Sequence, residues 1–338
     1  MISPRTLRNL RRELRQSQLA KLGIVVVLAV LLVATFAPVL APHNPYDQNL
    51  DESKLPPLGF SSETTSTSSE MVDGEIKIVN NTTYVEAQPS HPLGTDHLGR
   101  DMLSRVIYGA RTSLLVGVFG TVLAVLIGVT VGLVAGYYGG LIDDGLMRSA
   151  DVMLAFPSLV LAIALVGMFE RAVITLPDPI VALGVEPGMP AQIKLPGTVV
   201  VVVALVNWVW FARVARGEAL TVESEEYVKA ARSVGASDSF IIRRHVLPNS
   251  VTPIIVLATI QIAAIILLES ALSYLGFSGV NLSWGFDIAQ GRDHLATSWW
   301  IATVPGVAIV LTVVGINLVG DWLRDALDPG IEGEGGGV

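Results

Sequence analysis

Near position 100 the chain carries four residues whose side chains could bind a metal ion: His91, Asp96, His97 and Asp101. Their spacings match no established ligand set, so we assign them to helix capping and ion pairing and predict no metal site. The absence of cysteine excludes disulfides, thiolate zinc sites and cysteine nucleophiles. The chain also lacks a Gly-Lys dipeptide, hence a phosphate-binding loop with its lysine, and shows no supported Ser/His/Asp constellation. The sequence therefore predicts neither a catalytic site nor a bound cofactor.

The composition indicates a membrane protein. Of the 338 residues, 51% are apolar and 15% are charged, whereas a soluble domain carries about 25% charged residues. The apolar residues lie in long uncharged runs, which is typical of helices that contact lipid. Asp and Glu outnumber Lys and Arg by 30 to 22, so we expect membrane lipid, and no nucleic acid, as a partner. The acidic excess resembles that of proteins from high-salt organisms.

Six stretches are long and apolar enough to cross about 30 Å of hydrocarbon as helices. They run over residues 22–41, 113–138, 152–169, 197–211, 251–276 and 299–319. Fourteen of the 22 Lys and Arg residues fall on the side of the N-terminus, so the positive-inside rule places both termini in the cytoplasm. The sequons at Asn80, Asn81 and Asn281 then all lie outside. We predict an all-α, six-helix protein of the cell membrane.

The predicted organisation follows from these spans. A cytoplasmic tail (1–21) precedes the first helix (22–41), and an external loop with a surface helix (42–112) leads to a five-helix core (113–319). The core includes a cytoplasmic loop (217–250), and a second cytoplasmic tail (320–338) follows it. Within the external loop we expect Ser61–Ser69 to be solvated and poorly ordered. Thr95 or Asp96 should cap the surface helix.

Glycine and proline mark where the core helices pack and bend. The second span has glycines at every fourth position, 128, 132 and 136, which make a flat stripe for another helix. This seam either slides during gating or packs statically. After it we expect a short helix with the local pairs Asp144–Arg148 and Arg148–Asp151. Pro157 should kink the third span.

The cytoplasmic loop between the fourth and fifth spans is predicted to form two short helices. Ser224 caps the first helix, and two glutamates follow at the positive end of its dipole. Gly235 supplies a left-handed stop. Ser237 or Asp238 starts the second helix, and Pro248 closes it and opens the fifth span. Such a helix–glycine–helix hairpin is shaped to fit a groove on another protein.

This loop resembles the EAA loop of ABC-importer permeases, in which a Glu near an Ala-Ala pair is followed by Gly and Leu-Pro at fixed spacing. The matching positions are Glu226, Ala230, Ala231, Gly235, His245, Leu247 and Pro248, with His245 at the apolar position of the consensus. The distance from the Glu to the Ala pair is that of the dipeptide/oligopeptide/nickel branch. Further motifs of that branch match residues 94–101, 139–151, 156–157, 212–218, 269–276, 283–285 and 320–329. The chain is similar to the second of the two permease subunits in such systems.

The resemblance implies a type I ABC-importer permease fold and a chain that does not itself hydrolyse ATP. It implies that the EAA loop is a coupling helix seated in a cytoplasmic ATPase subunit. The implied partners are two such ATPases, a second permease subunit in a heterodimer, and an extracytoplasmic solute-binding protein. Dipeptides or oligopeptides are the implied solutes, and nickel or another small solute is the alternative within the family. A self-sufficient secondary transporter is less favoured, because we see no two-half repeat.

Glu269 is the most notable ionisable residue inside a predicted span. Burying a charge there is costly, so we expect it to line the translocation path or a gate, or to be paired structurally. Two external stretches, 171–196 and the polar part of the first loop, are longer than the family pattern. Details of how a binding protein docks therefore do not transfer to this chain.

Overall fold

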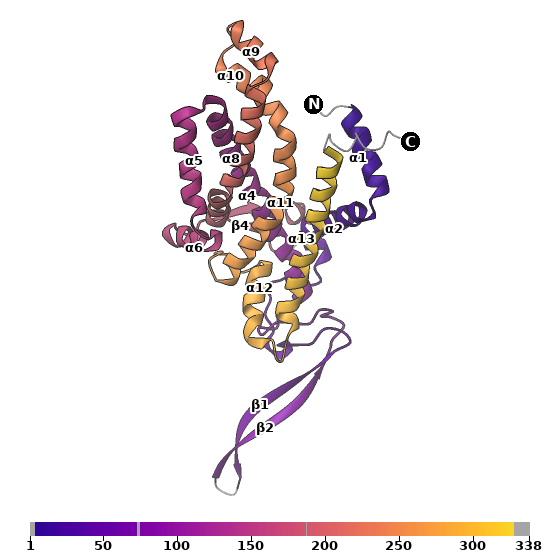
Figure 1. Ribbon diagram of the computed structural model, residues 1–338. Helices are drawn as coiled ribbons and strands as arrows, with labels where there is room; N and C mark the ends of the chain where they lie inside the picture. The colour runs from indigo at the N-terminus through magenta and orange to yellow at the C-terminus, as the bar shows by residue number, and fades with distance from the viewer. Residues whose placement is uncertain (1–3, 73–74, 187, 328–338) are drawn as a thin grey trace, which may run out of the picture.

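A computed structural model describes residues 4–72, 75–186 and 188–327. The protein is an elongated helical bundle with a long hairpin at one end, strands β1 (Ser61–Val72) and β2 (Glu75–Glu86). At the opposite end lie helices α9 (Glu226–Ser233) and α10 (Asp238–Ile241) (Figure 1). Helix α1 (Pro4–Gln16) and the last turns of α13 (Trp300–Leu327) also lie towards the α9–α10 end. Residues 328–338 of the predicted second tail are outside the described residues.

Among the described residues, five helices are long and apolar enough to span a membrane. Four are single helices: α2 (Gln18–Thr35), α4 (Met102–Tyr138), α8 (Gly197–Glu223) and α13. The fifth is the continuous stretch Asp238–Tyr274, which includes α10 and α11 (Leu247–Tyr274). A bent pair, α5 (Gly140–Leu154) and α6 (Ser158–Met168), makes a sixth span when counted as one. The predicted six-span helical fold is thereby confirmed.

The third span is not the kinked helix expected over 152–169. It begins as α5 at Gly140 and breaks after Leu154, and α6 then leaves at 94° to α5. Pro157 is extended, with ψ 128°, at the N-cap of α6. A proline cannot donate to the preceding turn and its ring crowds that turn, so the bend falls at the predicted residue. The predicted short helix before this span is the greater part of α5.

Helix α4 is one uninterrupted helix of 37 residues, about 55 Å long. The helix predicted to lead into the second span is the first part of α4, and its residues continue without a break into that span. Its expected caps were wrong. Asp101 is the N-cap and its carboxylate accepts from the backbone N–H of Ser104 at 2.7 Å, whereas Asp96 accepts from the N–H groups of Leu98 and Arg100 in the preceding turn.

The glycine stripe of α4 packs against α8. A Cβ atom at Gly132 would lie 2.8 Å from Cβ of Ala215, and one at Gly136 would lie 2.7 Å from Cβ of Ala219. Real Cβ atoms do not approach so closely, so these positions require glycine for α4 and α8 to meet at this distance. The stripe faces the inside of the bundle, as predicted. Its partner is a helix of the same chain.

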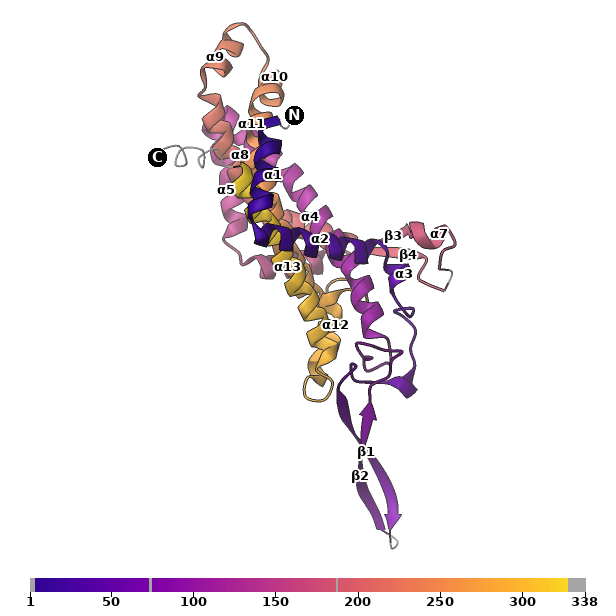
Figure 2. The ribbon, with the colours of Figure 1, turned by 90° about the vertical axis from the view of Figure 1, so that its right-hand side faces the viewer.

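Two β-hairpins project from the helices. β1 and β2 pair antiparallel over twelve residues each, from Ser61 opposite Glu86 to Val72 opposite Glu75. The prediction of a poorly ordered stretch at Ser61–Ser69 was therefore wrong. The second hairpin, β3 (Val173–Pro177) and β4 (Gln192–Pro196), carries the short helix α7 (Pro179–Ala182) and projects from the side of the bundle (Figure 2).

The remaining elements are short. Helix α3 (Ala37–Leu40) follows α2, and a 3-10 turn (Leu50–Glu52) precedes β1. Helix α12 (Trp284–Gly291) and a second 3-10 turn (Arg292–His294) connect α11 to α13. In Figure 1, α12 lies on the side of the bundle that faces the β1–β2 hairpin. These segments bring together the polar residues of that end.

The glycine seam gives the first testable prediction. Gly136→Ala should destabilise the protein by about 1 to 3 kcal/mol, because the added methyl overpacks the α4–α8 contact. Thermal unfolding of the purified protein in detergent measures the change. Gly145→Ala in α5 is the matched control, since nothing lies within 4 Å of its added Cβ, and it should leave the melting temperature unchanged or raise it. Equal melting temperatures for the two variants would contradict the close packing.

Candidate functional site

The hairpin formed by α9 and α10 carries the residues singled out from the sequence, and it stands out beyond the other helices (Figure 1). Its first helix is separated from α8 by an interruption of the helix at Ser224. Ser224 is the C-cap of α8, and Glu225 occupies the N-cap of α9 without a side-chain hydrogen bond. The expected capping by Ser224 was therefore wrong. Glu226 does lie in the first turn, where a carboxylate is favoured by the helix dipole.

Gly235 makes the turn between the two helices, as the sequence predicted. Its φ is +83°, a left-handed conformation that glycine adopts freely and that other residues rarely do. The N–H of Gly235 donates to the carbonyl of Arg232 at 3.1 Å, and the N–H of Ala236 donates to that of Ala231 at 3.1 Å. These bonds satisfy carbonyls at the end of α9. Ser237 then starts α10, also as predicted.

The second helix of the hairpin does not stop at Pro248. A π-helical turn, Ile242–Val246, joins α10 directly to α11, and Pro248 lies in the first turn of α11. Proline is tolerated in a first turn because its missing N–H costs little there. The predicted closure of the second helix at Pro248 was therefore wrong. A continuous helical path runs from the hairpin through the membrane-spanning length of α11.

The hairpin is seated firmly on the ends of α4 and α8. Val228, Ile241 and Val246 are fully buried in an apolar cluster that includes Tyr137 of α4 and Val222 of α8. The hydroxyl of Tyr137 also hydrogen-bonds the carboxylate of Asp238, with 2.7 Å between the oxygens. The hairpin is therefore packed directly on the ends of these two helices.

Arg232 adds a polar contact beside this apolar seat. Its guanidinium lies 5.4 Å from the centre of the Tyr137 ring and donates to Glu223 at 2.9 Å. The hydrogen bonds to Tyr137 and Glu223 raise the pKa of Arg232. The two helices of the hairpin and the ends of α4 and α8 are thus held by both apolar packing and charge-assisted bonds.

The outer face of the hairpin carries exposed apolar side chains among exposed charged ones. Val234, next to Gly235 at the turn, is 84% exposed, and Phe240 and Tyr227 are also exposed. Exposed too are Glu226, Ala230, Gly235 and Pro248, while Ala231, His245 and Leu247 are half-buried. The ring of His245 lies between those of Tyr227 and Phe240, with centroids 5.7 and 6.0 Å away. Large exposed apolar side chains on a rigid projection are typical of a surface that binds another protein.

Ion pairs tie α5 to α8 near this end of the bundle. Arg216 pairs with both carboxylate oxygens of Asp143 at 2.5 Å, and Arg213 pairs with Asp151 at 2.7 Å. The expected pairing of Asp151 with Arg148 was wrong, because α5 lies alongside α8 and the longer-range partner is within reach. The bidentate Asp143–Arg216 pair fixes the orientation of the two helices.

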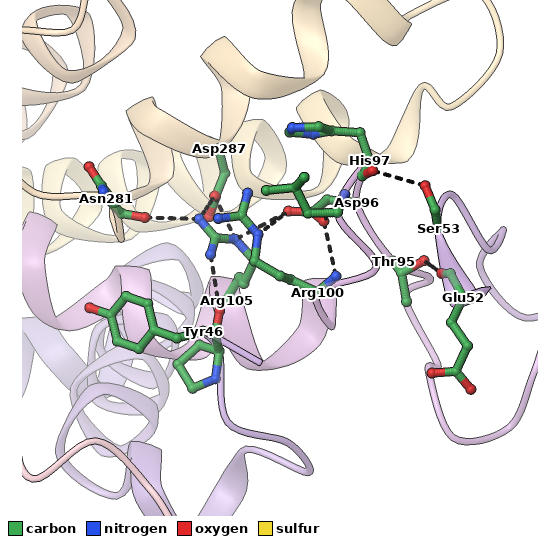
Figure 3. Close-up of polar contacts among 12 residues, drawn as sticks. Tyr46, Glu52, Ser53, Thr95, Asp96, His97, Arg100, Arg105, Asn281 and Asp287 are labelled. Atoms are coloured by element: carbon green, nitrogen blue, oxygen red, sulfur yellow. Dashed lines mark hydrogen bonds and ion pairs between the residues drawn. The ribbon is translucent and has the colours of Figure 1, made fainter. Parts of the chain in front are cut away.

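A buried polar network holds the opposite end of the bundle together, and the sequence analysis did not find it. Arg105, fully buried near the start of α4, pairs with Asp287 of α12 (Figure 3). The guanidinium also donates to the carbonyls of Pro45 and Asn281 at 3.0 Å. Burial raises the pKa of the Asp287 carboxyl, and the Arg105 charge opposes that rise. An arginine in an otherwise apolar first turn was the only sequence signal.

Asp96 and Arg100 extend this network. The Nε atom of Arg100 donates to Asp96 at 2.6 Å, which confirms the expected ion pairing of Asp96, and Asp96 also lies 3.9 Å from Nε of Arg105. Burial and the charge of Arg105 lower the pKa of Arg100. His97, the neighbour of Asp96, is directed to another histidine, His294, with ring centroids 5.4 Å apart. Two loops and two helices therefore meet around buried charges (Figure 3).

A second buried pair, Arg111 with Asp178, was also missed. Arg111 of α4 donates to the carbonyls of Ala34 and Thr35 at the end of α2, at 2.5 and 2.8 Å. Asp178 in turn caps α7 by accepting from the N–H of Ile180 at 2.9 Å. One arginine therefore joins the end of α2 to the β3–β4 projection.

Glu269 lies inside α11 and is completely buried. Its carboxylate accepts from the hydroxyl of Ser273 at 2.6 Å and from that of Ser113 on α4 at 3.0 Å. Ser270 lies at 3.4 Å. Among the described residues its surroundings are hydroxyl groups of the same chain. This geometry favours the structural one of the two roles considered for Glu269.

Comparison with known proteins gives two matching family models. Residues 128–333 match the binding-protein-dependent transport system inner membrane component, and residues 6–57 match the N-terminal TM domain of oligopeptide transport permease C. The first model extends from the last turns of α4 through α13 and includes the α9–α10 hairpin.

Several curated relatives match over most of the chain. The dipeptide transport system permease protein DppC of Alkalihalophilus pseudofirmus is 34% identical over 320 residues, which are 94% of this chain and 88% of the relative. DppC of Bacillus subtilis is 35% identical over 322 residues, 94% of this chain and 84% of the relative. The glutathione transport system permease protein GsiD of Pectobacterium atrosepticum is 39% identical over 242 residues, 71% of this chain and 73% of the relative.

Among solved structures, the inward-facing MetNI methionine ABC transporter is similar to this chain. The TM-score is 0.50 at 16% identity, over 67% of this chain and 98% of that chain. At this identity the likeness concerns the fold alone. It agrees with the type I importer fold expected from the sequence.

The Arg105–Asp287 pair gives the second prediction. Asp287→Asn should destabilise the protein by about 3 to 5 kcal/mol, because it leaves the charge of Arg105 buried without its counter-ion. Thermal unfolding in detergent measures this loss. Asp293→Asn is the control, since that carboxylate is exposed and pairs with Arg292 at 3.4 Å, and it should cost no more than about 1 kcal/mol. Similar losses in both variants would contradict a structural role for the buried pair.

Proposed function

The chain belongs to the family of binding-protein-dependent transport system inner membrane components, and we propose that it forms part of the path by which dipeptides or oligopeptides enter the cell. The names of its relatives, which include dipeptide and di/tripeptide permeases, support this class of solute. Its six-span helical fold supports a role in the membrane rather than in ATP hydrolysis. We propose that the chain itself is not catalytic.

We propose that the α9–α10 hairpin receives force from a cytoplasmic ATPase subunit. The observation that carries this proposal is that the turn of the hairpin exposes apolar side chains while the base of the hairpin is buried against α4 and α8. Val234 and Phe240 face outward, while Val228, Ile241 and Val246 anchor the hairpin to α4 and α8. A partner protein can bind the exposed turn while the buried base keeps the conformation of the hairpin. The proposed contact residues are those of the EAA-like pattern, from Glu226 to Pro248.

The transmission of that force is supported by the continuity of the helix beyond the hairpin. α10 passes through the π-turn into α11 without a break, so a displacement at Gly235 is carried along α11. α11 packs on α4, α8 and α13, the helices with which it would rock between two states. Glu269 and its serine partners lie on this helix and serve, in this proposal, to hold α11 against α4.

A groove on the α8, α11 and α13 faces is a candidate for part of the solute path. It has a volume of about 640 Å³, within the range of small-molecule sites. Most of its lining is apolar, and Glu218 and Arg324 bring one charge of each sign. A short peptide also carries one charge of each sign at its ends. This complementarity supports peptides over a metal cation as the solute.

We propose that the working assembly contains a second permease subunit, two ABC ATPase subunits and an extracytoplasmic solute-binding protein. We also place both termini in the cytoplasm. The excess of Lys and Arg on that side supports this orientation. The location of α1 and the end of α13 at the same end as the hairpin supports it as well.

Site-directed cross-linking tests the proposed contact. The chain has no cysteine, so Val234→Cys introduces a single reactive site on the exposed turn. A photoactivatable maleimide at this position, in native membranes, should cross-link to a subunit that carries a phosphate-binding loop, identified by mass spectrometry. Leu183→Cys, 81% exposed beyond α7, is the matched control and should not reach that subunit. Labelling of Val234→Cys without such a product would refute the coupling contact, and a product from Leu183→Cys would reverse the proposed orientation.

Substitution at the turn tests coupling. Gly235→Val should reduce dipeptide uptake by about tenfold while ATP hydrolysis continues, because a β-branched residue at φ +83° costs about 1 to 2 kcal/mol and deforms the turn. Uptake of a radiolabelled dipeptide and phosphate release are measured in the same vesicles. Gly235→Asn should retain most uptake, since Asn tolerates left-handed backbone. Wild-type uptake in Gly235→Val would contradict the proposal.

A further inference from the structure

Two histidines and an aspartate meet where the segment after α3 crosses the start of α4. His43 and His91 stack with ring centroids 4.6 Å apart and an interplanar angle of 28°. The Nδ1 atom of His91 lies 2.9 Å from Oδ1 of Asp101, and Nδ1 of His43 lies 3.9 Å from the same oxygen. One ligand atom from each residue falls within 4.8 Å of the others. Three metal-binding side chains from separate parts of the chain therefore converge on one point.

The distances between these ligand atoms lie on either side of the ligand–ligand distance in a tetrahedral metal site. Zn²⁺ binds imidazole nitrogen at about 2.0 to 2.1 Å, and tetrahedral ligands at that distance are about 3.4 Å apart. The 2.9 and 3.9 Å separations lie on either side of this value, so small side-chain rotations would equalise them. Two imidazoles and one carboxylate form a donor set that suits divalent transition metals rather than Mg²⁺ or Ca²⁺.

One ring nitrogen of His43 makes no hydrogen bond with the described residues. Among the described residues, Nδ1 of His43 is buried without a hydrogen-bond partner. A buried polar atom of this kind is rare and needs an explanation. The residue itself is fixed, because its backbone N–H donates to Oγ of Ser104 at 3.0 Å. Nδ1 itself is covered, but the rest of the side chain is 39% exposed, so the His43 ring borders solvent.

The other two residues have the outer contacts that metal ligands need. Oε2 of Glu52 lies 3.4 Å from Nε2 of His91, so a carboxylate can hold the far side of that ring while Nδ1 faces the cation. Glu52 is itself held by a 2.9 Å hydrogen bond from Asn49. Asp101 caps α4 through Oδ2, which leaves Oδ1 directed at the two histidines.

We propose that His43, His91 and Asp101 bind a divalent transition-metal cation such as Zn²⁺, with Glu52 orienting His91. The site uses two of the four residues first considered from the sequence and replaces Asp96 and His97 with His43. Asp96 pairs with Arg100, and His97 faces His294. The bound cation joins the segment after α3 to the first turn of α4. It is a structural clamp at the end of the bundle opposite the α9–α10 hairpin.

Zinc titration of the full chain tests the proposal. The protein is purified in detergent through a tag without histidine, stripped with a chelator, and titrated with ZnCl₂ at pH 7.5 against a chromophoric competitor. We expect one saturable site per chain and a rise in melting temperature on binding. His43→Asn should weaken binding by at least about tenfold, and Glu52→Gln should weaken it by about tenfold, as loss of an outer carboxylate does.

His294→Asn is the matched control, because it removes a histidine from the other stacked pair at this end of the bundle. It should leave zinc affinity unchanged. His43→Asn removes no hydrogen bond of the folded chain and only the stacking contact with His91, so its melting temperature without zinc should lie close to that of the wild type. Absence of saturable binding, or equal affinity in wild type and His43→Asn, would overturn the proposal. Loss of binding in His294→Asn alone would do so too, by assigning the metal to the His97–His294 pair.

Discussion

The close contact of α4 and α8 is the constraint on which the rest of the structure depends. Glycines at positions 128, 132 and 136 bring the backbones together, and any side chain there would collide with α8. In a lipid environment no hydrophobic driving force draws helices together, so close packing of small residues has to supply the attraction. Both helices end beneath the α9–α10 hairpin, where Tyr137 and Val222 form its seat. The position of the hairpin is therefore set by backbone contact directly beneath its seat, since Gly136 immediately precedes Tyr137 in α4.

Charge is used differently at the two ends of the bundle. Beneath the hairpin, Asp143 and Arg216 are partly exposed and join neighbouring helices. At the other end, Arg105, Asp287 and Arg111 are buried and join segments far apart in sequence. Buried pairs cost desolvation and contribute little net stability, but breaking one is expensive. These pairs fix which loops meet. They thereby specify how α2 and α12 are arranged around the first turns of α4.

The sequence predicted what depends on local chemistry. The apolar runs identified the spans, glycine at position 235 identified the left-handed turn, and Pro157 identified the bend. The sequence did not predict contacts between residues that are far apart along the chain. Arg105 and Asp287 are 182 residues apart, and nothing near either residue names its partner. His43 was likewise too far from His91 for a spacing rule to connect them. The β1–β2 hairpin was a different failure, because its first strand is mostly Ser, Thr and Glu, and the Asp-Gly dipeptide at 73–74 before the β-branched residues of 75–86 was not used as a turn signal.

The helical connection between α10 and α11 determines how the hairpin is joined to the membrane-spanning part of the chain. Had Pro248 ended the second helix, a flexible joint would separate the hairpin from the membrane, and a push on Val234 would bend that joint. The π-turn keeps the path helical between α10 and α11, although Pro248 and Pro253 in α11 have no N–H to donate. The break at Ser224 lies on the other arm, between α8 and α9. One arm of the hairpin thus continues into a membrane-spanning helix, and the other is separated from α8 by the interruption at Ser224. In the proposed coupling, force applied at the turn passes into α11, the helix that carries Glu269 and packs on α4, as well as into the α4–α8 seat.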